Sequence, residues 1–136
     1  MPEMTVEALF DQIGPVTDFV NAQLAELGCS EHVRIQVDVA IDEIFGNIAR
    51  YAYQPRTGPA TVHVHAEKDP LSVVITFRDR GMPYNPLSAE FNDTTHLPAK
   101  QRPIGGLGLF MVKKTMDDVS YSYQDGQNIL TLRKRI

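Results

Sequence analysis

The sequence is poor in the residues that mark secreted, membrane-spanning and nucleic-acid-binding proteins. It has one cysteine, Cys29, and no tryptophan; one cysteine excludes an internal disulfide and fits a reducing compartment, so a cytoplasmic protein is expected. No apolar run approaches the length of a membrane span, and residues 1–5 lack the basic-then-apolar order of a secretion signal. Lys and Arg number 13 against 17 Asp and Glu, which argues against direct binding of nucleic acid.

What remains is the composition of an ordinary globular domain. The chain has 136 residues, of which 43% are hydrophobic and 22% charged. This length suits one domain, spanning residues 1–136, with a single core. No internal repeat or low-complexity segment interrupts the chain.

The first half of the chain is predicted to be mostly helical. Residues 4–10 are predicted as a short strand, although a helix is nearly as well supported. Apolar residues then recur at helical spacing from Ile13, and Gly28 is the expected C-cap. Ser30 is a plausible N-cap for a second helix, the most strongly periodic segment, which ends near Tyr53.

The second half is predicted to be mostly strands. A long irregular segment, residues 82–104, interrupts it and holds four of the nine prolines; so long a loop in a compact domain is usually a functional lid. Two strands are expected before this segment, at residues 61–66 and 71–77. After it we expect a short helix that holds Leu109, Val112 and Met116, and then a final hairpin formed by residues 119–123 and 128–136. The order predicts an α+β two-layer sandwich: a mostly antiparallel five-stranded sheet with three helices on one face.

Glu43 and Asn47 are spaced i, i+4 on the second predicted helix, so their side chains project from the same face. A carboxylate there could accept a proton, and an amide oxygen one turn on could bind a hard cation such as Mg²⁺. The alternative is an ordinary hydrogen bond at a half-exposed helix edge.

Asp79 and Gly81 follow a predicted buried strand, a place where ligands are often bound. The carboxylate of Asp79 could accept a hydrogen bond from an exocyclic amine, and Gly81 would leave room for a flat ring. An Asx turn, which Asp-x-Gly forms commonly, explains the same residues without a ligand.

Gly105, Gly106 and Gly108 stand where the irregular segment gives way to the third helix. Glycines at this point allow a bulky ligand to approach the backbone, and the unpaired amides of a helix start suit a phosphate. The stretch is neither a Walker A loop nor a dinucleotide fingerprint, and a simple turn is the alternative.

Several other residue types are assigned no function. His63 and His65 share one strand face but have no third metal ligand nearby, so a solvated face is expected. Cys29 is expected to be an inert buried thiol. The aromatic residues expected in the core are Phe19, Phe45 and Phe110.

Taken together, three motifs in this order resemble the ATP-binding domain shared by sensor histidine kinases, gyrase and heat-shock chaperones. They are Glu43-x-x-x-Asn47, Asp79-x-Gly81-x-Pro83 and Gly105-Gly106-Leu107-Gly108. The fuller strings at 42–53 and 105–117 look typical of bacterial anti-sigma-factor serine/threonine kinases, and the resemblance covers essentially the whole chain.

The resemblance implies a role for each of these residues. Glu43 would be the general base, and Asn47 would ligate Mg²⁺. Asp79 would bind the adenine amine of ATP, with Gly81 packed close to the base. Residues 82–104 would be an ATP lid. The phosphate contacts would come from the backbone of Gly105, Gly106, Leu107 and Gly108, and from the side chain of Arg102, for which a solvated loop arginine is equally well supported.

The same resemblance implies two protein partners. One is a STAS-domain anti-anti-sigma protein phosphorylated on serine or threonine, and the other is an RNA polymerase sigma factor that the kinase sequesters. A homodimer through the uncovered sheet face or the first strand stays open. The alternative function is a nucleotide-binding module that sequesters a partner without transferring phosphate.

Overall fold

The protein is built on one antiparallel sheet. The computed structural model describes residues 2–87 and 106–136. The strands are β1 (Glu3–Glu7), β2 (Pro59–Glu67), β3 (Ser72–Asp79), β4 (Asp118–Gln124) and β5 (Gln127–Arg135). Their order across the sheet is β1-β2-β3-β5-β4, and every neighbouring pair is antiparallel.

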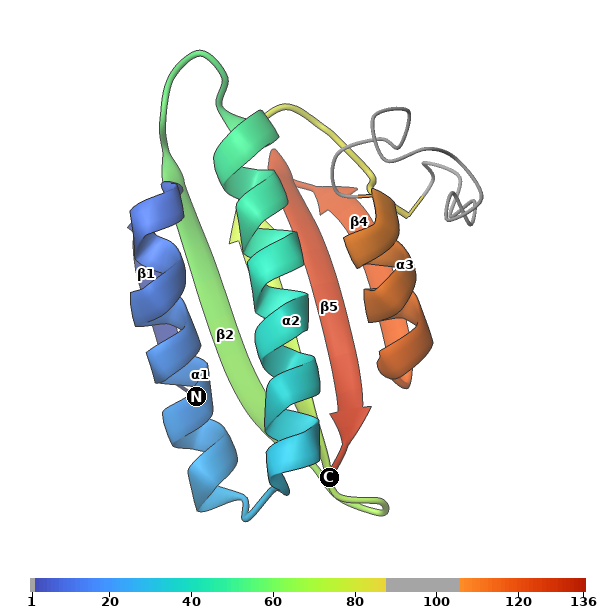
Figure 1. Cartoon of the computed structure of the whole chain (residues 1–136). Coiled ribbons are helices and arrows are strands. Elements are labelled where there is room, and N and C mark those ends of the chain that lie inside the picture. Colours follow the sequence, from blue (N-terminus) through green and yellow to red (C-terminus); the bar gives the residue numbers. More distant parts are fainter. Residues whose placement is uncertain (1, 88–105) are drawn as a thin grey trace.

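Three helices cover one face of this sheet. They are α1 (Ile13–Glu26), α2 (Glu31–Asn47) and α3 (Gly106–Thr115). They lie side by side with α2 in the middle (Figure 1). This arrangement confirms the predicted α+β two-layer sandwich. Within residues 2–87 and 106–136, no helix is both long and apolar enough to cross a bilayer.

Local signals in the sequence account for where several elements begin and end. Ser30 caps α2, since its Oγ accepts a hydrogen bond from the backbone N–H of Val33 at 3.2 Å. Gly28, at φ +72°, ends the turn after α1. Asp125 and Gly126 have φ of 54° and 76°, as the tight turn between β4 and β5 requires.

The structure differs from the prediction at both ends of the helical half. The strand β1 stops at Glu7, and a 3₁₀ turn, η1 (Phe10–Gln12), precedes α1. The regular α2 helix stops at Asn47, and a π-helical turn, η2 (Ile48–Ala52), carries the chain to Tyr53. Such wide turns occur often at functional sites.

The core lies between the helices and the sheet. Phe45 is fully buried there, as predicted, and Phe19 is partly buried against it. The prediction for Phe110 was wrong: it is half-buried outside the core, with Nζ of Lys114 4.9 Å from its ring centroid. Cys29 was also expected to be buried, but it is half-exposed at the end of α1, where it only borders the core.

Candidate functional site

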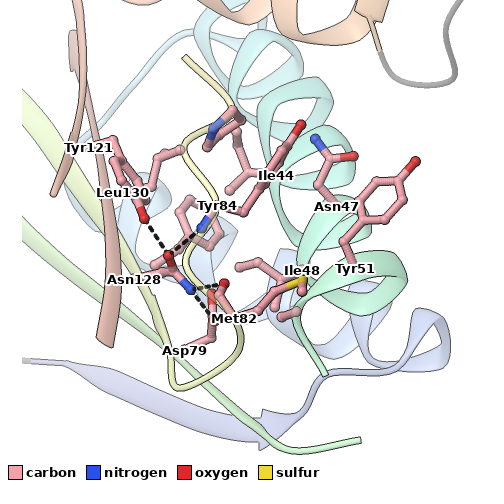
Figure 2. A pocket seen from close by; sticks show the side chains of 13 residues that line it. Ile44, Asn47, Ile48, Tyr51, Asp79, Met82, Tyr84, Tyr121, Asn128 and Leu130 are labelled. Atoms are coloured by element: carbon pink, nitrogen blue, oxygen red, sulfur yellow. Dashed lines mark hydrogen bonds between the residues drawn. The ribbon is translucent and has the colours of Figure 1, made fainter. Parts of the chain in front are cut away.

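A pocket opens between the C-terminal half of α2, the turn η2, and the ends of β3 and β5 (Figure 2). Its walls are mostly apolar, with a few polar groups, which is the usual character of a small-molecule site. The apolar lining is Ile44, Ile48, Ala52, Phe77, Met82, Pro86 and Leu130. The polar lining is Asn47, Tyr51, Asp79, Tyr84, Tyr121 and Asn128.

Asp79 is the buried carboxylate of this pocket, with 6% of its surface exposed. Its Oδ1 accepts hydrogen bonds from the backbone N–H of Gly81 and from Nδ2 of Asn128, each at 2.9 Å. Burial raises the pKa of Asp79, and these two hydrogen bonds oppose the rise. Among the described residues no hydrogen bond to Oδ2 is found, and Asp79 lines the pocket, so Oδ2 is the atom that could accept a hydrogen bond from a ligand.

The Asx turn considered for Asp79 and Gly81 is therefore present together with the pocket. Gly81 is needed for packing, since a Cβ there would lie 2.2 Å from the carbonyl oxygen of Ala52. The backbone N–H of Met82 donates to that same oxygen at 2.9 Å. Gly81 thus lets the end of β3 pack against η2, and its contact with a base stays a prediction.

Glu43 and Asn47 lie one turn apart on α2. Asn47 is buried and lines the pocket. Glu43 is half-buried, and its buried Oε1 has no hydrogen-bond partner in the part of the chain described. Desolvation raises the pKa of Glu43, against the lowering effects of Arg50 and Asn47, while Asp42 adds to the rise. A carboxylate with a raised pKa beside a pocket is a good proton acceptor.

The start of α3 packs directly against Glu43. A Cβ on Gly108 would lie 2.0 Å from Oε2 of Glu43 and 2.4 Å from its Cδ. Two other residues of the predicted glycine stretch, Gly106 and Leu107, form the first turn of α3. Gly105, the predicted phosphate contact Arg102 and most of the predicted lid lie outside the described residues.

A basic and aromatic group lies beside Glu43 that no sequence motif predicts. The guanidinium of Arg50, in η2, lies 5.5 Å from the ring centroid of Phe10 and 5.8 Å from that of Tyr51. The ring of Tyr51 lies 6.1 Å from that of Tyr84. The guanidinium of Arg50, positioned by these rings near the carboxylate of Glu43, would attract phosphate.

The two strand histidines are not part of this site. His63 and His65 lie on β2 with ring centroids 5.8 Å apart. Burial is the main reason why the pKa of His63 is lowered. No cluster of three metal-binding side chains of the His, Cys, Asp or Glu type occurs in residues 2–87 and 106–136, so a metal here would need other ligands.

Comparison with known proteins finds protein kinases of bacteria. The chain is 30% identical over 103 residues to the serine/threonine-protein kinase BtrW of Bordetella bronchiseptica, covering 76% of this chain and 71% of that one. It is 26% identical over 93 residues to the serine-protein kinase RsbW of Bacillus cereus, covering 68% of this chain. The chain spans 58% of the length of that RsbW.

A comparison of folds finds a histidine kinase. The histidine kinase AdeS of Acinetobacter baumannii matches with a TM-score of 0.49 and 13% identity, covering 99% of this chain and 68% of that one. The model of the histidine kinase-like ATPase domain matches residues 6–134. That match spans nearly the whole sequence, and the chain therefore belongs to the histidine kinase-like ATPase family.

Proposed function

We propose that this protein binds ATP with Mg²⁺ and transfers the γ-phosphoryl group to a serine or threonine of a partner protein. The observation that carries the proposal is the placement of two carboxylates. Asp79 lies in the pocket with one oxygen free, and Glu43 lies along α2 beyond Asn47, with a raised pKa. A module that only binds nucleotide would not need the carboxylate of Glu43 as a proton acceptor.

The base of the nucleotide would lie in the apolar pocket. Oδ2 of Asp79 would accept a hydrogen bond from the exocyclic amine of adenine, and Gly81 would lie close to the ring. The phosphates would then lie along α2 toward the start of α3, where the backbone amides of residues 105–108 would hold them. Arg102 and Arg50 would add positive charge.

The side chains on α2 fit a magnesium ion. Mg²⁺ prefers oxygen ligands and keeps several waters, so one or two protein oxygens are enough. The amide oxygen of Asn47, which is buried and lines the pocket, would be the protein ligand. When bound, the ion would neutralise charge on the phosphates.

Glu43 would act as the general base. It would take the proton of the acceptor hydroxyl as the hydroxyl oxygen forms a bond to the γ-phosphorus, while the bond from that phosphorus to the bridging oxygen breaks and ADP leaves. Burial favours this role, because it raises the pKa of Glu43 and so makes the carboxylate a stronger base.

The likeness to the kinases RsbW and BtrW, together with the sequence motifs, supports two protein partners. The phosphate acceptor would be a STAS-domain anti-anti-sigma protein, and an RNA polymerase sigma factor would be the second partner. Binding of the two would be mutually exclusive.

A transfer assay tests the function. The protein would be incubated with γ-labelled ATP, Mg²⁺ and each STAS-domain protein encoded by the same genome. We expect Mg²⁺-dependent label on one serine or threonine of one of these proteins. ATP binding with no label on any of them would contradict the kinase and favour the sequestering module.

The contact between Gly108 and Glu43 gives a first testable consequence. In Gly108→Ala the new methyl group would overlap the carboxylate, which is the flexible end of a side chain and can turn away. Alanine favours a helix, so α3 should still form. We expect phosphoryl transfer to fall about 10- to 100-fold, with ATP affinity changed less than about threefold, measured by transfer rates and calorimetry.

The matched control is Gly126→Ala, in the turn between β4 and β5, where a Cβ meets no atom within 4 Å. Its positive φ makes alanine strained, so it should lower thermal stability while transfer per folded molecule is kept. Equal transfer by Gly108→Ala and wild type would show that Gly108 does not position Glu43.

A further inference from the structure

One side chain outside the sequence motifs joins the main parts of the pocket. Nδ2 of Asn128, on β5, donates to Oδ1 of Asp79 at 2.9 Å and to the carbonyl oxygens of Met82 at 3.0 Å and Gly81 at 3.4 Å. Its Oδ1 accepts from the backbone N–H of Tyr84 at 3.1 Å and from the hydroxyl of Tyr121 (Figure 2). Only 7% of Asn128 is exposed.

The chemistry of the neighbours fixes the orientation of this amide. The N–H of Tyr84 can only donate, so it must face the oxygen of Asn128. The carbonyls of Gly81 and Met82 can only accept, so they must face the nitrogen. Nδ2 is therefore held toward Asp79 by groups that would be left unpaired if the amide turned over.

The position of Asn128 in the sheet explains why it reaches these groups. It lies on β5 directly opposite Asp79 on β3. The segment 81–84, which forms a wall of the pocket, begins where β3 ends. Asn128 thus ties that wall and the carboxylate to one rigid strand.

We propose that Asn128 is a positioning residue that makes the pocket selective for a base with an exocyclic amine over a base with a carbonyl at the same place. Its hydrogen bond to Oδ1 of Asp79 would leave Oδ2 as the acceptor for the ligand. The inference rests on the proposed function, because it takes ATP as the ligand, and it adds a residue that acts through Asp79.

Loss of the Asn128 amide would change what Asp79 can recognise. Its donor stabilises the ionised carboxylate against the burial that favours the protonated form. Without it Asp79 would turn more freely and protonate at higher pH. A protonated Asp79 could donate to a carbonyl, which the ionised group cannot.

The test compares ATP with inosine triphosphate, which carries a carbonyl in place of the amine. Wild type, Asn128→Ala, Asn128→Ser and Gln127→Ala would be titrated with each Mg²⁺-nucleotide by calorimetry. Gln127 is the matched control, an amide on the neighbouring residue that does not line this pocket. Asn128→Ser leaves a smaller hole if the alanine variant does not fold.

We expect wild type and Gln127→Ala to prefer ATP about 10- to 100-fold. In the Asn128 variants the affinity for ATP should fall by about that factor, and the affinity for inosine triphosphate should fall by less than about threefold. The preference for ATP should therefore nearly vanish. As the pH is lowered, the ATP affinity of the Asn128 variants should begin to fall at a higher pH than the ATP affinity of wild type.

Two results would overturn the inference, and they differ in what else they remove. Equal weakening of both nucleotides would show that Asn128 only supports the fold, and the kinase proposal would stand. Failure of wild type to bind ATP would remove the kinase proposal as well.

Discussion

ATP binding is expected to weaken at least about 100-fold when Asp79 is replaced by asparagine. The N–H of Gly81 and Nδ2 of Asn128 both donate to the Oδ1 position. They would hold the oxygen of the new amide there, which turns its NH₂ group toward the pocket. That group would then meet the amine of adenine, donor against donor. Calorimetry of ATP with Mg²⁺ measures the loss.

The fold of Asp79→Asn should be retained. Because burial raises the pKa of Asp79 in the folded state, the folded protein holds this proton more tightly than the unfolded chain. The free energy of unfolding therefore falls as pH rises from the pKa of Asp79 in the unfolded chain to its raised pKa in the folded protein. At neutral pH the ionised carboxylate lowers the stability of the fold. The neutral variant should be at least as stable as wild type there, by thermal unfolding.

Asp118→Asn is the matched control, since Asp118 is exposed on β4, away from the pocket. It should bind ATP like wild type. If Asp79→Asn is folded and binds ATP with unchanged affinity, Asp79 does not accept a hydrogen bond from the amine of adenine.

Phosphoryl transfer is expected to fall about 100- to 10,000-fold in Glu43→Gln, while ATP affinity stays within about threefold. Glutamine has nearly the same shape, so the contact with Gly108 is kept and only the proton acceptor is lost. Transfer from labelled ATP to the acceptor protein, set against calorimetry, separates the two effects. Asp42→Asn, at the exposed neighbour on α2, is the control and should keep most of the transfer.

The pH profile gives a second reading of Glu43. Because its pKa is raised above the ordinary 4.5, the wild-type rate should rise with pH through that raised value and then level off. This acid limb should be absent in Glu43→Gln. Transfer at the wild-type rate in the variant, with the acid limb intact, would mean that another group is the base.

Much of the fold could be predicted because local signals agree with it. The apolar spacing of α2, the Ser30 cap and the Asp125-Gly126 turn each determine a short stretch of chain, and the structure shows all three. The order of such elements then leaves few packings. Asp79 and Asn47 could be named as candidates because they sit at a strand end and on a helix face, and both line the pocket.

Other parts depend on contacts between distant residues. Asn128 follows a hairpin turn and has no motif of its own. Its contact with Asp79 appears only when β5 pairs with β3 and places the two residues opposite each other. Arg50 could not be placed because α2 was expected to remain regular, whereas η2 widens there. Phe110 lies outside the core because α3 buries Leu109 and Val112 instead.

Binding of ATP to the wild-type protein tests the central claim most directly. The titration would be run by calorimetry with Mg²⁺, and repeated with a chelator in its place. Saturable one-to-one binding that weakens without Mg²⁺ is the predicted result, since Asp79 would recognise the base and Asn47 the ion. No binding heat up to millimolar ATP would contradict the account, because neither the pocket nor the two carboxylates would then serve a kinase.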